Sequence, residues 1–190
     1  MKKNVITAFL MTIATTILLG VFYPLVVTVI AQVAFHDKAN GQIRYRDGRA
    51  IGSRIIGQPF TSAKYFHSRL SNAGRGYDAA NSGGTNFAPT NQKLIDRVQA
   101  DAKSLHEENP NQPIPTDLIT TSASGLDPEI SPAAAEFQVP RVARERGLSE
   151  SVVRSLVQRC TAQRDLGLLG EPRVNVLELN LALDELAQRR

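Results

Sequence analysis

Residues 6–30 read ITAFLMTIATTILLGVFYPLVVTVI, an uncharged and mainly apolar stretch near the start of a 190-residue chain. The charge-free region around it extends from Val5 to Phe35. A helix needs about 20 consecutive apolar residues to cross a bilayer, and this stretch is long enough. The sequence therefore predicts a transmembrane helix. We assign residues 1–35 to an N-terminal anchor and residues 36–190 to a soluble domain.

A cleaved signal peptide also begins with basic residues and an apolar run. Its apolar core is only about 7–15 residues long, so an uncleaved single-pass anchor is the better interpretation. The residues leave the orientation open. Lys2 and Lys3 favour an N-terminus inside, whereas the basic residues between positions 38 and 54 favour the opposite. Long domains can also cross a membrane regardless of their charge.

The soluble domain is close to charge balance. Lys2 and Lys3 are the only Lys or Arg residues before it, so the domain contains 20 of the 22 Lys and Arg residues and all 18 Asp and Glu residues. This balance argues against a nucleic-acid-binding surface. Cys160 is the one cysteine in the sequence. The chain can therefore form neither an internal disulfide nor a cysteine-based metal site.

The patterns in the soluble domain predict an α+β fold that is mainly helical, with a small β-sheet. Residues 37–49 are polar and typical of a loop, and short strands are expected at 53–56 and 117–121. Residues 65–89 are rich in Gly, Asn, Ser and Ala and lack any period. They indicate an ordered but irregular loop. A loop of that length in a compact domain is often functional.

Start and stop signals predict the helices. Thr90 is the expected cap of a helix that ends near Glu107, because apolar residues recur between them at helical spacing. Ser131 followed by proline marks a second start. Gly147 should end that helix, and Pro140 should bend or divide it.

Two more helices are expected towards the C-terminus. Ser149 should cap the first, with Leu148 and Val153 at the spacing of a hydrophobic staple. Asn175 and Glu178 have the spacing of a capping box before the last helix.

The usual catalytic constellations are missing from the sequence. Its three histidines are scattered without metal-ligand spacing. Neither a nucleophile-elbow motif nor a P-loop occurs. Asp127 precedes a proline, where aspartate more often shapes a turn. We therefore expect a chain that is not an enzyme and binds no metal.

Residues 82–86, Ser-Gly-Gly-Thr-Asn, form the most suggestive local run. Consecutive small residues can expose backbone N–H groups and form an anion-binding nest. Glycines are also the default residues of tight turns, so a packed turn is the simpler interpretation.

Residues 142–157 resemble a helix-turn-helix, with two helices around a glycine. A membrane-anchored DNA-binding regulator is therefore an alternative function. Only Arg154 and Arg159 are basic in the candidate recognition helix, and paired helices around a glycine are also a common packing arrangement. We expect no nucleic-acid partner.

Two groups of residues are candidates for contacts with partner proteins. Small and hydroxyl residues along the membrane helix allow close approach of other helices, and they include Ala8, Thr12, Thr16 and Gly20. Aromatic residues of the irregular loop either belong to the core or anchor a partner surface, and these are Tyr65, Phe66 and Tyr77.

These motifs together resemble the KdpC family, the C subunits of the bacterial potassium-transporting Kdp P-type ATPase, over nearly the whole chain. The longest matching segments are GSRIIGQPF (52–60), YDAANSGGTNFAPTN (77–91), DLITTSASGLDPEISPAAAEFQVPRVARERG (117–147) and GEPRVNVLELNLALD (170–184). The chain departs from the family pattern at Leu70, where proline is usual, at Thr85, where serine is usual, and at Phe87, where leucine is usual.

The resemblance implies a non-catalytic accessory subunit of a high-affinity, ATP-driven potassium import complex in the bacterial inner membrane. Its partners would be a P-type ATPase subunit, a potassium-channel-like subunit and a small accessory subunit. The family's C subunit is required for assembly and has been assigned a role in raising the ATP affinity of the ATPase subunit. Potassium would be the cargo of the complex and not a ligand of this chain. The nucleotide-binding candidates that the resemblance carries over are Ser82, Gly83, Gly84, Thr85, Asn86 and Gln138.

The family arrangement also implies that the soluble domain lies in the periplasm. A periplasmic domain cannot touch cytoplasmic ATP, so an effect on ATP would be a coupling free energy transmitted through partner subunits. We therefore expect a periplasmic domain without direct contact to ATP.

Overall fold

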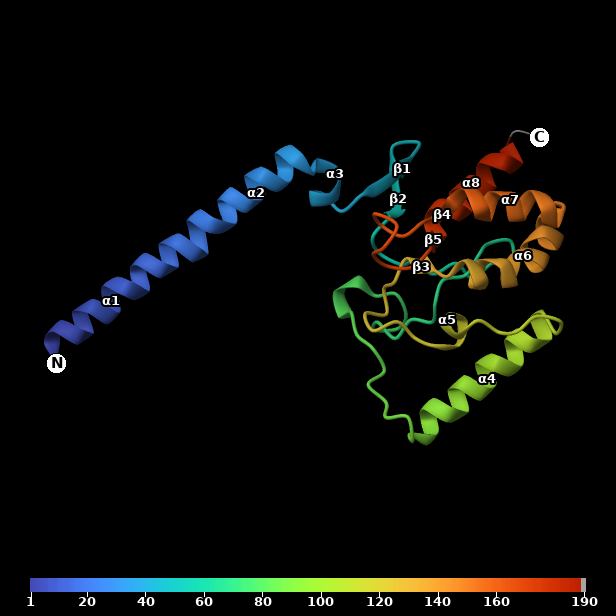
Figure 1. Ribbon diagram of the computed structural model, residues 1–190, viewed down its shortest axis with the longest axis horizontal. Helices are drawn as coiled ribbons and strands as arrows, with labels where there is room; N and C mark the ends of the chain where they lie inside the picture. Colours follow the sequence, from blue (N-terminus) through green and yellow to red (C-terminus); the bar gives the residue numbers. More distant parts are fainter. Residues whose placement is uncertain (189–190) are drawn as a thin grey trace. The chain divides into compact units, whose positions relative to one another are not determined.

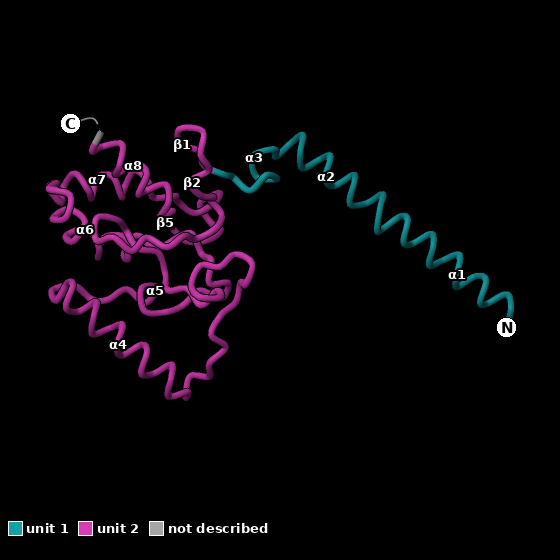
Figure 2. The backbone as a smooth tube through the Cα atoms, turned by 180° about the vertical axis from the view of Figure 1, so that it is seen from behind, with its two compact units in different colours: residues 1–43 teal, residues 44–190 magenta. Residues whose placement is uncertain are grey.

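The computed structural model describes residues 1–188 and contains two compact units, residues 1–43 and residues 44–190 (Figure 2). The fold class agrees with the prediction, because an N-terminal apolar helix is joined to a mainly helical region with small antiparallel sheets. The predicted division between anchor and soluble domain after residue 35 remains a prediction.

One long helix dominates the first unit. It consists of α1 (Lys2–Ile17), the π-helical turn η1 (Leu18–Phe22) and α2 (Tyr23–Ala34), and the short helix α3 (His36–Ala39) follows it (Figure 1). From Lys2 to Ala34 the helix is long and apolar enough to cross a membrane, and no residue of its most apolar part is buried. These are the properties expected of a single membrane anchor.

Pro24 accounts for the π-helical turn. Proline has no N–H, and its ring collides with the carbonyl four residues earlier in a regular helix. The turn just before it is widened, because the Tyr23 N–H donates to the carbonyl of Leu18, five residues back. The helix therefore continues past Pro24 without interruption.

A β-hairpin occupies the region where the sequence predicted a loop at 37–49 and a strand at 53–56. Strands β1 (Ile43–Arg46) and β2 (Arg49–Ser53) form a two-stranded sheet. Asp47 and Gly48 join them with φ angles of 51° and 73°, the conformation of a two-residue hairpin turn. The predicted loop at 37–49 and the predicted strand at 53–56 were therefore wrong. The Asp-Gly turn signal was overlooked because the strands on either side of it are rich in polar residues.

A three-stranded antiparallel sheet in the order β3-β5-β4 lies beside the core. Its strands are β3 (Glu129–Ile130), β4 (Thr161–Ala162) and β5 (Arg173–Asn175). Val174 of the central strand is opposite Ile130 on one side and Thr161 on the other. Its side chain is completely buried, so the sheet is fixed to the core at this point.

The strand predicted at 117–121 is instead the short helix α5 (Thr116–Ile119). Asp117 lies in its first turn, where a negative charge is favourable. The same carboxylate accepts hydrogen bonds from the N–H and the hydroxyl of Ser131 at 2.8 and 3.1 Å. Tertiary contacts thus override the local β propensity of this segment.

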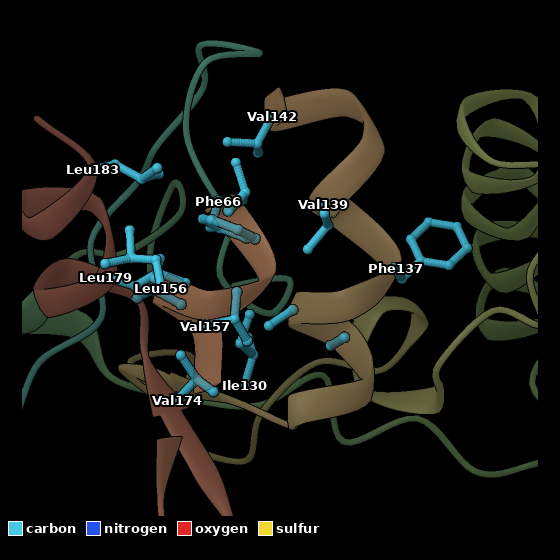
Figure 3. Close-up of a cluster of buried hydrophobic side chains, with 14 of the residues drawn as sticks. Phe66, Ile130, Phe137, Val139, Val142, Leu156, Val157, Val174, Leu179 and Leu183 are labelled. Atoms are coloured by element: carbon cyan, nitrogen blue, oxygen red, sulfur yellow. The ribbon is translucent and has the colours of Figure 1, made fainter. Parts of the chain in front are cut away.

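Three helices enclose the main core, which Figure 3 shows. They are α6 (Pro132–Arg146), α7 (Glu150–Cys160) and α8 (Val176–Gln188). Helix α7 packs against both α6 and α8. Phe66 comes from the irregular loop and is completely buried among the side chains of these helices, including Val139, Val142, Leu179 and Leu183.

The predicted start of α6 is confirmed, because the Ser131 hydroxyl accepts a hydrogen bond from the Ala134 N–H at 3.0 Å. Gly147 ends the helix with a left-handed φ of 61°, as expected. Pro140 does not divide the helix. Ser149 is the N-cap of α7 by position, but its hydroxyl bonds to that of Ser151 instead of the backbone.

The other helix starts differ little from the predictions. Helix α4 (Gln92–Glu108) is capped by Asn91, whose side chain accepts a hydrogen bond from the Lys93 N–H, and not by Thr90. The Asn175 side chain accepts a hydrogen bond from the Glu178 N–H at 3.1 Å, so half of the predicted capping box forms. Between residues 65 and 89 the only regular element is the 3-10 turn η2 (Ala79–Asn81), as the irregular-loop prediction expected.

Candidate functional site

The irregular loop is held in place by a group of polar side chains that we call the loop clamp: Gln138, Arg141 and Arg146 of α6, and Asn180 and Asp184 of α8. Asn180 is almost completely buried. Its amide accepts from the Phe66 N–H and donates to the Phe66 carbonyl, both at 2.9 Å. Asn180 therefore satisfies both backbone groups of a buried residue that has no strand partner.

Gln138 pairs in the same way with the next residue of the loop. Its carbonyl oxygen accepts from the His67 N–H at 2.8 Å and from Arg141 at 2.7 Å. Its amide nitrogen donates to the carbonyls of His67 and Ala134 at 3.1 and 3.2 Å. A glutamine amide offers two donors and two acceptor lone pairs, so Gln138 has no capacity left for a nucleotide.

Arg141 extends the clamp towards the beginning of the loop. Its guanidinium donates to the carbonyls of Ala63 and Tyr65 at 2.6 and 2.9 Å and pairs with Glu108 of α4 at 2.8 Å. Burial and the nearby Arg141 charge lower the pKa of His67. His67 is therefore poorly suited to carry a proton near neutral pH.

Asp184 completes the clamp on the α8 side. It pairs with Arg146 at 2.9 Å and accepts a hydrogen bond from the Tyr65 hydroxyl at 3.2 Å. The Arg146 guanidinium also lies 4.7 Å from the centre of the Tyr65 ring and donates to the Lys64 carbonyl at 2.7 Å. Tyr65 is thereby engaged within the chain.

Residues 82–86 pack against another turn of the same chain. The Ser82 hydroxyl and the Gly83 N–H both donate to the Ser124 carbonyl at 2.9 Å. Asn72 donates to the Gly84 carbonyl at 3.2 Å. Gly125 has a φ of 67°, and a Cβ there would lie 2.6 Å from the Ala73 nitrogen, so the opposing turn depends on this glycine.

The nucleotide-binding candidates have different partners and do not form one site in the structure. Residues 82–84 lie against the turn around Ser124, whereas Gln138 is bonded to His67 and Arg141. The Gly83 N–H, which an anion-binding nest would need, already has a partner in the chain. For Thr85 and Asn86 the structure records one notable feature, the positive φ of 51° at Asn86.

The aromatic partner candidates are mostly internal. Phe66 is completely buried and belongs to the core, so it is not available to a partner in this fold. The Tyr77 hydroxyl donates to the Arg69 carbonyl, and burial raises the pKa of Tyr77. The loop aromatics therefore stabilise the loop itself.

The membrane-helix candidates, in contrast, are all exposed. Ala8, Thr12, Thr16 and Gly20 recur every fourth residue and therefore share one side of the helix. The Thr12 hydroxyl donates to the Ala8 carbonyl at 2.9 Å, which satisfies its polar group without a partner. A Cβ at Gly20 would meet only the Thr16 methyl at 3.9 Å, an ordinary contact.

Helix α7 does not have the features of a DNA-reading helix. Arg154 is paired with Glu136 at 2.6 Å and Glu150 at 3.3 Å, so its charge is compensated within the chain. Three residues of α7 (Val153, Leu156 and Val157) are buried in the core. The regulator alternative therefore finds no support.

An open cavity of about 630 Å³ lies between β3, β5 and α5, and charged residues contribute to its lining. These charges are largely paired, Arg69 with Asp127 at 3.0 Å and Arg173 with Glu129 at 3.3 Å. Burial raises the pKa of Glu129. Within residues 1–188, no group of three or more His, Cys, Asp or Glu side chains is placed to hold a metal ion.

Sequence reasoning missed Asn180, Arg141 and Asp184, although the first of them left a signal. Asn180 lies among Leu177, Leu179, Leu181 and Leu183, in a segment whose one other polar residue is Glu178. A polar residue among the apolar residues of a helix points to a buried hydrogen bond.

The comparisons with known proteins all point to one family. The family model described as KdpC, the c chain of the K⁺-transporting ATPase, matches residues 5–185. The "Potassium-transporting ATPase KdpC subunit" of Koribacter versatilis is 67% identical over 97% of this chain and 95% of that protein. Proteins of the same description from Rhodopseudomonas palustris BisB18 and Caulobacter vibrioides are 53% and 55% identical, over 97% and 89% of this chain and 98% and 86% of theirs.

We expect Gln138→Ala to lower the free energy of unfolding by about 2 kcal/mol or more, because it leaves buried partners of the loop clamp unsatisfied. The measurement is urea unfolding of the full chain in detergent, followed by circular dichroism. Gln112→Ala, at an exposed glutamine, is the control and should change little. Equal midpoints for the two variants would contradict the clamp.

Proposed function

The chain belongs to the KdpC family, the c chains of the K⁺-transporting ATPase, and from that premise we propose that it acts as a non-catalytic subunit that holds the potassium-importing complex together. The observation that carries the proposal is the long apolar helix, which has no buried residue in its most apolar part, no charge from Val5 to Phe35, and small residues along one side. A single helix whose stretch from Val5 to Phe35 contains no Asp, Glu, Lys, Arg or His offers no relay for an ion. Small residues on one side instead favour close packing against another membrane helix.

The soluble unit supplies a second surface for assembly. Two linked contacts with one complex raise the effective concentration of each, so neither contact has to be strong by itself. The loop clamp supports this role, because a loop that is already ordered loses little conformational entropy on binding. The partners we propose are the P-type ATPase subunit, the potassium-channel-like subunit and the small accessory subunit.

Catalysis in this complex is proposed to lie in another subunit. The sequence lacks a P-loop and a nucleophile elbow. Of the charged residues that line the cavity between β3, β5 and α5, Arg69 pairs with Asp127 and Arg173 with Glu129. Potassium is proposed to be the cargo of the complex, without a binding site on this chain.

Gly20→Leu should weaken the complex, because the larger side chain prevents close approach of a partner helix while it fits within its own helix. We expect about tenfold less of the other subunits to co-purify, and potassium-stimulated ATPase activity to fall in parallel. Ala14→Leu makes a similar change on the opposite side of the helix and is the control. A stable, active pump from cells that lack this chain would refute the assembly function.

We also propose that the soluble unit lies in the periplasm, as the arrangement expected for the family implies and as Lys2 and Lys3 at the other end of the helix support. Asn111→Cys in a Cys160→Ser chain places one thiol at an exposed position. The native cysteine is replaced although it should react slowly, because burial raises the pKa of Cys160. A membrane-impermeant maleimide should label intact cells, and labelling only after lysis would contradict this orientation.

An influence on ATP is proposed to pass through the partner subunits and not through residues 82–86. Gly83→Val tests this cleanly, because a Cβ there has no neighbour within 4 Å. The ATP concentration for half-maximal pump activity should stay unchanged in this variant. Gly84→Val is the comparison for disturbed packing, since its Cβ would lie 3.0 Å from the Ala123 carbonyl. A higher ATP requirement for Gly83→Val with normal assembly would restore the nucleotide role.

A further inference from the structure

The turn between β4 and β5 presents leucines to solvent. Leu166 is 91% exposed, Leu168 82% and Leu169 62%. The first two values are the highest of any large apolar side chain described between residues 44 and 188. Scattered exposed leucines are ordinary, but three within four residues form a compact apolar projection. We call residues 164–171 the leucine turn.

The leucine turn is rigidly built. Asp165 and Leu169 exchange two backbone hydrogen bonds of 2.8 and 2.9 Å, and the Gly167 N–H donates to the Arg164 carbonyl at 3.1 Å. The flanking strands β4 and β5 pair with each other, and β5 contains the buried Val174. The turn is therefore fixed to the core of the soluble unit.

Its backbone carries a conformation that leucine rarely adopts. Leu166 has a φ of 54°, in the left-handed region where a Cβ is unfavourable. Glycines with positive φ, Gly167 and Gly170, lie on either side of the other two leucines. Residues in such sparsely populated conformations cluster at functional sites, so the conformation of Leu166 supports a functional role for this turn.

The charges around the leucines are paired. Arg164 pairs with Glu171 at 2.6 Å, and Arg173 pairs with Asp165 at 3.3 Å. A loop that inserts into an anionic membrane surface normally carries excess Lys and Arg. A compensated polar rim around an apolar centre is instead the pattern of a protein interface. The fixed shape also favours a protein pocket, because fluid lipid does not reward one side-chain arrangement over another.

We propose that the leucine turn docks into an apolar pocket on another protein subunit of the potassium-transporting complex. The inference rests on the proposed assembly function and specifies the second contact that it requires. Leu166 and Leu168 enter the pocket, and the ion pairs at the rim stay at its polar edge. The ordered turn binds without further reorganisation, which reduces the entropy lost on docking.

The test uses the full chain expressed together with the rest of the pump. In the double variant Leu166→Ser, Leu168→Ser we expect at least about tenfold less co-purified partner, as for lost burial of one to two leucines. Ile55→Ser alters another exposed apolar residue and should have no such effect. An unchanged urea midpoint excludes misfolding, and Leu168→Gln alone is a milder variant if the double variant unfolds.

A photo-reactive amino acid at position 168 identifies what covers the turn. Cross-linking to another subunit of the pump is expected. Cross-linking to lipid only, or to nothing, overturns the inference, and so does normal co-purification of the double variant. Deletion of the whole chain separates the two proposals. If deletion abolishes assembly and the double variant does not, only the leucine-turn inference fails; if deletion leaves the pump intact, the assembly function itself fails.

Discussion

The soluble unit depends on the amides of Asn180 and Gln138, which bind the backbone of Phe66 and His67. Phe66 fills the centre of the core, but it comes from a segment without helix or strand partners. Its N–H and carbonyl would each be costly to bury unpaired. The two amides remove that cost, so an irregular loop can contribute the central side chain of the core.

The two arginines of the loop clamp also satisfy backbone groups, and each of them is paired with a carboxylate. Arg141 joins the carbonyls of Ala63 and Tyr65 to the Glu108 carboxylate. Arg146 joins the Lys64 carbonyl, just before the loop, to the Asp184 carboxylate. Buried charges are stable only when they are paired and hydrogen-bonded, and both guanidinium groups meet this condition. Because each arginine bonds to several residues distant in sequence, loss of one would release the loop at several points.

The sequence predicted those features whose causes are local. The membrane helix follows from its uncharged length, and Ser131 and Gly147 delimit α6 through capping interactions within a few residues. The hairpin at Asp47-Gly48 had a local signal that its polar strands concealed. Features that depend on residues distant in sequence were missed. Asp117 lies in a helix, where its carboxylate bonds to Ser131. The hydrogen bonds of Gln138 form only because the fold places α6 beside His67. A role carried over from a family motif therefore could not reveal that the Gln138 amide is already saturated.

Exposure distinguishes the residues that remain available for function. Two loop aromatics that were candidates for partner contacts are engaged within the chain: Phe66 lies in the core, and Tyr65 contacts Arg146 and Asp184. The leucine turn, which the composition did not single out, keeps its apolar side chains in solvent although its backbone is fully ordered by hydrogen bonds and ion pairs. A tight turn between two strands accounts for the positive φ of Leu166, but it does not require a leucine there, and burial of an apolar side chain would be more favourable. A second protein that covers the turn would supply the missing burial, which is the docking that we propose.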